Sequence, residues 1–193
     1  MNYIDEKFKD ILLKILDRFI QICNEHNLKY TLLGGSVLGA IRHKGIIPWD
    51  DDIDVGMPRD DYEKLLSIAD NVFGRKYKLV SAYNDKNYVY PFAKLFDNDT
   101  TLIESKDFFY LGGIYIDIFP LDGIPQNANK RIHRIWKIRY AATNLILAKY
   151  SFNYKKQYYF RYLIYKTIFR SFNNALKICD KYFQKYTYSK QYN

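Results

Sequence analysis

The stretch that decides the fold is GIIPWDDDIDVGM, residues 45–57. Within it Asp52 and Asp54 stand two apart, with Ile53 between them and Val55 after them, which is the alternation of a β-strand. Because successive side chains of a strand point to opposite faces, the two carboxylates are predicted to share one face. Like charges this close raise a pKa or recruit a hard cation such as Mg²⁺. The stretch therefore predicts a metal site suited to phosphate chemistry.

A glycine turn precedes the acids. Residues 30–33 are predicted to form a short strand that runs into Gly34, Gly35 and Ser36, and a helix is predicted over residues 37–43. Small residues between a strand and a helix let the backbone approach a phosphate, and free amides there favour an anion. The alternative is a tight turn in which Ser36 is simply the N-cap.

The rest of the chain alternates between helical and extended patterns. An amphipathic stripe predicts a first helix over residues 4–26. Further elements are expected as a strand at 52–56, a helix at 58–72, extended stretches at 78–82, 89–96, 101–104 and 112–123, and helices at 129–148 and 152–186. This order predicts an α+β fold with a mixed sheet flanked by helices.

Two charged residues interrupt apolar strands. Asp117 shares a predicted strand face with Tyr115 and Phe119, while isoleucines occupy the opposite face, and a lone acid there is costly to bury without a partner. A metal would serve as that partner. Lys94 lies in the apolar stretch PFAKLF, and a buried lysine needs an anion. Asp97 and Asp122 are expected to be turn residues.

The composition argues for a folded protein. Of the 193 residues, 48% are hydrophobic and 18% are aromatic, which excludes a disordered chain. The first residues are charged, and we find no signal-peptide pattern and no apolar run long enough to span a membrane, so a cytoplasmic location is expected. The cysteines, Cys23 and Cys179, have no zinc-ligand spacing and are expected to be buried thiols.

The charge is distributed unevenly. Residues 130–193 contain 15 Lys and Arg against one acid, Asp180, and hold 11 of the 20 tyrosines. We therefore expect a core over residues 1–128 and a basic, Tyr-rich helical region over residues 129–193. That region would bind an anionic glycan, lie at the membrane surface, or pack its aromatic side chains on the core. Nucleic-acid binding is not favoured, because no nucleic-acid module accompanies the charge.

The segment LLGGSVLGAIRHKGIIPWDDDIDVGMPRDDYEKL, residues 32–65, resembles the signature block of the LicD family. The resemblance continues through FAKLFDNDT and YIDIFPLDG and covers about residues 5–125. It implies a nucleotidyltransferase fold of the polymerase-β type. Because family members generally continue with a further C-terminal segment, we expect that segment not to be represented in these 193 residues.

The resemblance also implies roles for particular residues. The metal carboxylates, for Mg²⁺ or Mn²⁺, would be Asp52, Asp54 and Asp117. Residues expected to bind the donor's phosphates or lie beside the metals are Gly34, Gly35, Ser36, Arg42, Lys94 and Asp50.

The activity that the resemblance implies is transfer of a phospho-alcohol, above all phosphocholine from CDP-choline, to a hydroxyl of a surface glycan, with release of CMP. The acceptor would be a precursor of lipopolysaccharide or of teichoic acid, and such precursors can be lipid-linked at the inner membrane leaflet. Two alternatives stay open: transfer of a nucleoside monophosphate to a small molecule, a protein or RNA, and a nucleotide-binding member without activity.

Overall fold

The computed structural model describes residues 5–85, 88, 90–103 and 112–123, together with scattered residues between 133 and 181. The chain forms two compact units. The first contains Met1–Ser81, Phe92–Leu102 and Leu111–Leu121, and the second contains Ala82–Pro91, Ile103–Tyr110 and Asp122–Asn193. The acids and the glycine turn belong to the first unit. The predicted division after residue 128 stays a prediction.

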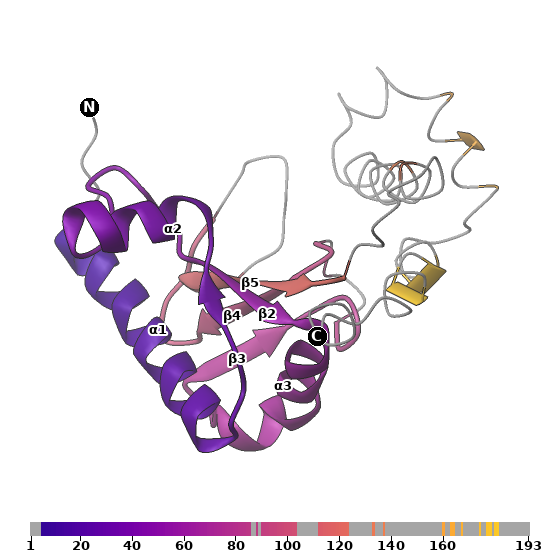
Figure 1. Cartoon of the computed structure of the whole chain (residues 1–193), viewed down its shortest axis with the longest axis horizontal. Coiled ribbons are helices and arrows are strands. Elements are labelled where there is room, and N and C mark those ends of the chain that lie inside the picture. Colours follow the sequence, from indigo (N-terminus) through magenta and orange to yellow (C-terminus); the bar gives the residue numbers. More distant parts are fainter. Residues whose placement is uncertain are drawn as a thin grey trace, which may run out of the picture. The chain divides into compact units, whose positions relative to one another are not determined.

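A five-stranded mixed sheet forms the centre of the first unit (Figure 1). Its strand order is β1-β2-β5-β4-β3, in which β2 and β5 are parallel and the other neighbours are antiparallel. The strands are β1 Thr31–Leu32, β2 Asp54–Pro58, β3 Tyr77–Val80, β4 Ala93–Asp97 and β5 Tyr115–Leu121. The predicted α+β fold with a mixed sheet is confirmed.

Two helices cover one face of this sheet. Helix α1 spans Glu6–Glu25, and the side chain of its N-cap, Asp5, accepts the amide of Lys7 at 2.9 Å. Helix α3 spans Arg59–Val72 and follows β2 directly. In Figure 1 both helices lie against the strands, α1 against β4 and β5 and α3 against β2, β3 and β5. Asp54 of β2 and Asp117 of β5 lie on the opposite face of the sheet.

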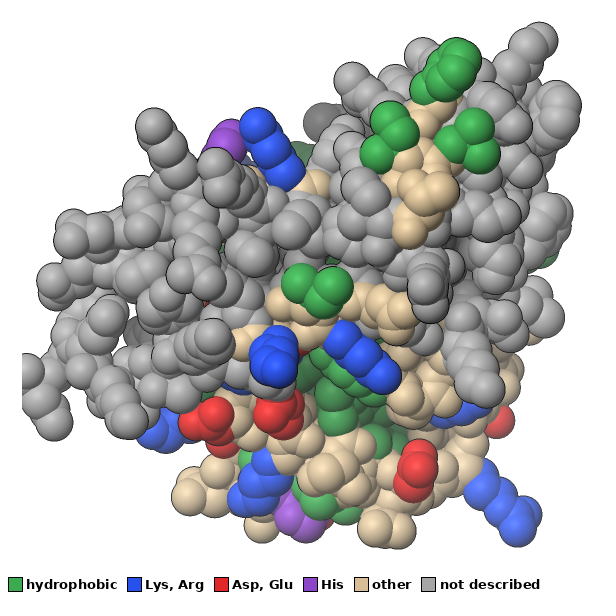
Figure 2. Space-filling view, turned by 90° about the vertical axis from the view of Figure 1, so that its right-hand side faces the viewer, with side chains coloured by type: hydrophobic (Ala, Val, Ile, Leu, Met, Phe, Trp, Pro, Cys, Tyr) green, Lys and Arg blue, Asp and Glu red, His purple; other side chains and the backbone are tan. Residues whose placement is uncertain are grey.

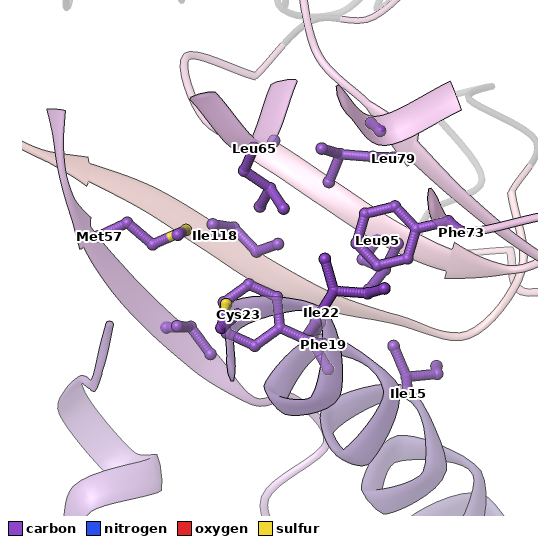
Figure 3. Packing of buried hydrophobic residues seen from close by; sticks show 14 of the residues in the cluster. Ile15, Phe19, Ile22, Cys23, Met57, Leu65, Phe73, Leu79, Leu95 and Ile118 are labelled. Atoms are coloured by element: carbon purple, nitrogen blue, oxygen red, sulfur yellow. The ribbon is translucent and has the colours of Figure 1, made fainter. Parts of the chain in front are cut away.

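The core lies between these helices and the sheet (Figure 3). Phe19 and Ile22 of α1 pack with Leu65 of α3 and with Leu95 and Ile118 of the sheet, and all five are almost completely buried. Burying each such side chain contributes about 1.5–3 kcal/mol. Because one face of the sheet is held in this way, the direction of the side chains on the other face is fixed as well.

Cys23 belongs to the same core. It is fully buried, and this burial raises the pKa of its thiol to about 12, so the group stays protonated. The prediction of a buried thiol is confirmed for Cys23, while Cys179 lies outside the described residues.

Some element boundaries differ from the prediction. The helix after the glycine turn begins earlier: α2 spans Gly34–Leu38 and continues as the π-helix η1, Gly39–His43. Its N-cap is Leu33, so the interpretation of Ser36 as a simple N-cap was wrong. The carbonyl of Leu33 accepts the amides of Ser36 and Val37, which starts the helix three residues sooner.

The strand boundaries also differ from the prediction, and β2 has the predicted length but is shifted by two residues. β2 begins at Asp54 rather than Asp52, because pairing with β5 starts at Asp54. The stretch 101–104 contributes an isolated bridge, Leu102 to Gly112, in place of a strand. The helices predicted at 129–148 and 152–186 fall largely outside the described residues.

The surface of the described part carries charges of both signs. Figure 2 shows acidic and basic side chains interspersed on the face turned toward the viewer. This agrees with the mixed composition of the first 129 residues, in contrast to the basic C-terminal third. Among the helices in the part of the chain that the structure describes, none has the length and apolar character of a transmembrane span.

Candidate active site

Three acids meet on the face of the sheet that α1 and α3 leave uncovered. Asp54 on β2 and Asp117 on β5 are direct partners in the parallel register, and Asp52 lies two residues before Asp54. One carboxylate oxygen of each residue lies within 4.8 Å of those of the other two. The structure therefore brings together the three residues that the sequence singled out as metal ligands.

Backbone hydrogen bonds hold these acids in place. The amide of Asp117 donates to the carbonyl of Ile53 at 2.9 Å, and the amide of Leu33 donates to the carbonyl of Asp54 at the same distance. The amide of Asp54 donates to the hydroxyl oxygen of Ser36 at 2.9 Å. Ser36 thus links the first turn of α2 to the strand that carries Asp54, a role that sequence reasoning did not find.

The glycine turn lies directly against the carboxylates. Gly34 has φ +52°, a left-handed conformation that favours glycine, and a Cβ there would lie 3.3 Å from Asp54 Oδ2. A Cβ on Gly35 would lie 2.5 Å from Asp50 Oδ2, closer than side chains tolerate. Gly34 is therefore favoured by its backbone conformation, and a side chain at position 35 would displace the Asp50 carboxylate.

Burial and mutual repulsion shift the acids toward their protonated forms. Burial is the largest cause that raises the pKa of Asp117 to about 7; Lys94 opposes the shift, and the charges of Asp54 and Asp52 add to it. Burial, followed by the charges of Asp54 and Asp50, raises the pKa of Asp52 to about 6. Burial and Asp50 also raise the pKa of Asp54. A cation among the three carboxylates would relieve this cost.

Lys94 and Asp117 form a buried ion pair. They are cross-strand partners on β4 and β5, and Lys94 Nζ lies 3.2 Å from Asp117 Oδ1. Lys94 is 2% exposed, so the expectation that it is buried beside an anion holds. Its ammonium also lies 3.2 Å from the centre of the Tyr115 ring. Sequence analysis placed Tyr115 on the face of Asp117 but did not recognise this contact.

A second set of acids adjoins the first. Carboxylate oxygens of Asp50, Asp51 and Asp52 also lie within 4.8 Å of one another, so Asp52 belongs to both sets. Asp50 is half-buried and Asp51 is exposed. Asp50 was among the residues predicted from the sequence, whereas Asp51 was not, although it lies in the run of three aspartates at residues 50–52.

A cavity of about 300 Å³ opens beside this second set. Ser36, Lys44, Asp50 and Asp52 form its polar lining. Its remaining walls are mostly aliphatic, from Leu13, Leu16, Leu32, Ala40, Ile46, Ile47 and Ile53. Arg42 does not line it: this residue is exposed at the end of η1, where its Nε donates to His43 Nδ1 at 3.4 Å.

The donor set fits a hard divalent cation. All three converging side chains offer carboxylate oxygens, the ligands that Mg²⁺ and Mn²⁺ prefer. Asp117 Oδ1 is buried, and among the described residues it accepts no hydrogen bond of good geometry, although Lys94 lies beside it. The three carboxylates therefore suit a hard metal ion with phosphate ligands.

Comparison with known proteins assigns this arrangement to a family. A family model described as "LicD/FKTN/FKRP, nucleotidyltransferase domain" matches residues 27–170, which contain the glycine turn and the acids of both clusters. The chain belongs to the LicD family. Within this family, the lipopolysaccharide cholinephosphotransferase LicD of Haemophilus influenzae is 36% identical to the chain over 138 residues. That match covers 68% of the chain and 51% of the Haemophilus protein.

Shorter matches extend the LicD relationship. The human ribitol 5-phosphate transferase FKRP is 56% identical over 34 residues, 18% of this chain and 7% of FKRP. The uncharacterized protein RP689 of Rickettsia prowazekii is 46% identical over 48 residues, 25% of this chain and 18% of that protein. The chain thus spans about half the length of the Haemophilus LicD protein and smaller shares of the other two.

Proposed function

We propose that the chain is a metal-dependent transferase that moves a phospho-alcohol group from a CDP-linked donor to a hydroxyl group of a glycan, with release of CMP. The observation that carries the proposal is the convergence of Asp52, Asp54 and Asp117 beside a glycine turn in a LicD-family domain. Two relatives support the class of reaction, because one is a cholinephosphotransferase and the other a ribitol 5-phosphate transferase.

In this proposal Asp52, Asp54 and Asp117 hold one cation. Asp52 belongs to both acidic sets and would also bind a second cation. When bound, a divalent cation offsets charge on the phosphoryl oxygens and lowers the pKa of the attacking hydroxyl. Gly34 and Gly35 are the first residues of α2, so their amides have no hydrogen-bond acceptor within the helix. These amides would bind the donor's phosphates. Arg42 is exposed and would approach the diphosphate from η1.

The proton of the acceptor hydroxyl needs a base. Asp117 offers a carboxylate on β5 directly beside Asp54, within the group of acids that would hold the cation. Asp117 would accept the proton as the hydroxyl oxygen attacks the phosphorus distal to the nucleoside. The bond from that phosphorus to the oxygen of CMP breaks, and CMP leaves.

We propose CDP-choline as the donor and a lipopolysaccharide or teichoic acid precursor as the acceptor. The Haemophilus relative is named a lipopolysaccharide cholinephosphotransferase, which supports such an acceptor. The reaction would take place in the cytoplasm, and the basic region over residues 129–193 would provide peripheral contact with the inner leaflet or an anionic glycan.

Product analysis tests the proposal. Purified protein with Mg²⁺ is incubated with CDP-choline, CDP-ribitol or CDP-glycerol and a glycan acceptor, and CMP is measured by chromatography. We expect Mg²⁺-dependent CMP release with at least one donor, and loss of release in Asp54→Asn. Pyrophosphate release from a nucleoside triphosphate instead would establish the nucleotidyl transfer alternative. Donor binding without either product would indicate an inactive nucleotide-binding member.

A further inference from the structure

The ammonium of Lys94 is enclosed inside the acid site. It lies 3.2 Å from Asp117 Oδ1, 3.2 Å from the centre of the Tyr115 ring and 5.9 Å from the centre of the Phe92 ring. The side chain of Lys94 is 3% exposed and that of Asp117 is 11% exposed. Both lie on central strands held by backbone pairing, so the positive charge cannot move far from the carboxylate.

This position does not suit direct contact with a diphosphate. To reach a donor in solution, the ammonium would have to leave Asp117 and the Tyr115 ring, and the carboxylate would then remain buried beside two other acids. Breaking a buried ion pair by removing one partner is strongly destabilising. Lys94 therefore interacts with the buried acids rather than with a ligand that enters the site from solvent.

We propose that Lys94 is a positioning residue that acts as the internal cation of the acid site. In the metal-free protein strand pairing holds Asp117 beside Asp54, and the charge of Lys94 offsets part of the repulsion among the three carboxylates. The same charge repels a divalent cation, so the site binds the free metal weakly and takes it up best together with an anionic phosphate ligand. This inference rests on the proposed metal-dependent function and gives Lys94 a different partner from the diphosphate expected from the sequence.

Metal titration distinguishes this role from a purely structural one. Mn²⁺ binding is measured by electron paramagnetic resonance at pH 8 for the wild type, Lys94→Met and Lys94→Gln. If the charge of Lys94 opposes the cation, each variant binds Mn²⁺ at least about tenfold more tightly, because a unit charge a few ångström away is removed. If Lys94 only supports the packing, Asp117 loses its position and Mn²⁺ binds more weakly.

Lys76 offers a matched control. Its Nζ lies 3.8 Å from Asp97 Oδ2 and 5.5 Å from the centre of the Tyr77 ring, so it also combines an ion pair with a ring contact. Its side chain is 49% exposed, and neither of its partners belongs to the acid sets. We expect Lys76→Met to leave Mn²⁺ affinity unchanged.

A double-mutant cycle completes the test. Unfolding by denaturant in the presence of a chelator is compared for Lys94→Met, Asp117→Asn and the double variant. We expect the double variant to regain most of the stability that Lys94→Met loses. Additive losses, or unchanged or weaker Mn²⁺ binding in the Lys94 variants, overturn the inference. Absence of Mn²⁺ binding in every variant, the wild type included, overturns the metal-dependent function as well.

Discussion

Replacing Asp117 by asparagine should change how the stability of the metal-free protein depends on pH. Asp117 is 8% exposed, and burial raises its pKa from 3.8 to about 7, so between these values the folded state binds a proton that the unfolded state does not. Its contribution to stability is fully present below about pH 4 and is lost as the pH rises through 7. Each pH unit in this range corresponds to about 1.4 kcal/mol.

The expected magnitude follows from that shift. Between pH 5 and pH 7.5 the wild type should lose about 2.5 kcal/mol of unfolding free energy relative to Asp117→Asn, since the folded carboxyl releases its proton over this interval.

Urea unfolding in the presence of a chelator, followed by circular dichroism at both pH values, provides the measurement. Asp70→Asn, at an exposed position of α3, serves as the control and should run parallel to the wild type. Adding Mg²⁺ should reduce the loss of unfolding free energy at pH 7.5, because a bound cation offsets the negative charge that Asp117 gains when it releases its proton. Parallel curves for the wild type and Asp117→Asn would refute the account of a buried, mutually repelling acid cluster.

Three further substitutions, two of them with a control substitution, test the packing and the glycine turn. Leu12→Ala, at a fully buried position of α1, should cost about 2–5 kcal/mol in urea unfolding, whereas Leu13→Ala, at a position 41% exposed, should cost less than about 1 kcal/mol. Ser36→Ala removes the acceptor of a β2 amide and should lower the unfolding free energy by about 1 kcal/mol; an unchanged value would mean that the bond is not formed. Gly35→Ala should weaken Mn²⁺ binding, because its Cβ would lie 2.5 Å from an aspartate oxygen, while Gly45→Ala, whose Cβ meets nothing within 4 Å, should leave calorimetric Mn²⁺ titrations unchanged.

Much of the site could be predicted because the geometry of a strand determines which side chains share a face. The alternation around Asp54 and Asp117 requires both side chains to face away from the core, and the parallel pairing of their strands then places them side by side. Asp97, predicted as a turn residue, is instead the last, buried residue of β4, and its carboxylate accepts the amide of Asp99 at 2.9 Å in the turn that follows.

The remaining features depend on contacts between distant parts of the chain. The ammonium of Lys94 meets Asp117 and the Tyr115 ring because β4 pairs with β5, which no local pattern specifies. The hydrogen bond from the Asp54 amide to Ser36 joins residues 18 positions apart. Local reasoning treated Ser36 as a cap for its own helix, and the strand that actually uses its hydroxyl lies elsewhere in the sequence.

The most direct test of the central claim is to locate a bound metal ion. Crystals grown with Mn²⁺ and CDP-choline would be measured at a wavelength where manganese scatters anomalously. The account predicts an anomalous peak with Asp52, Asp54 and Asp117 as its protein ligands and with donor phosphate oxygens beside it. A map with no peak at these three carboxylates, from crystals in which the donor is bound, would contradict it.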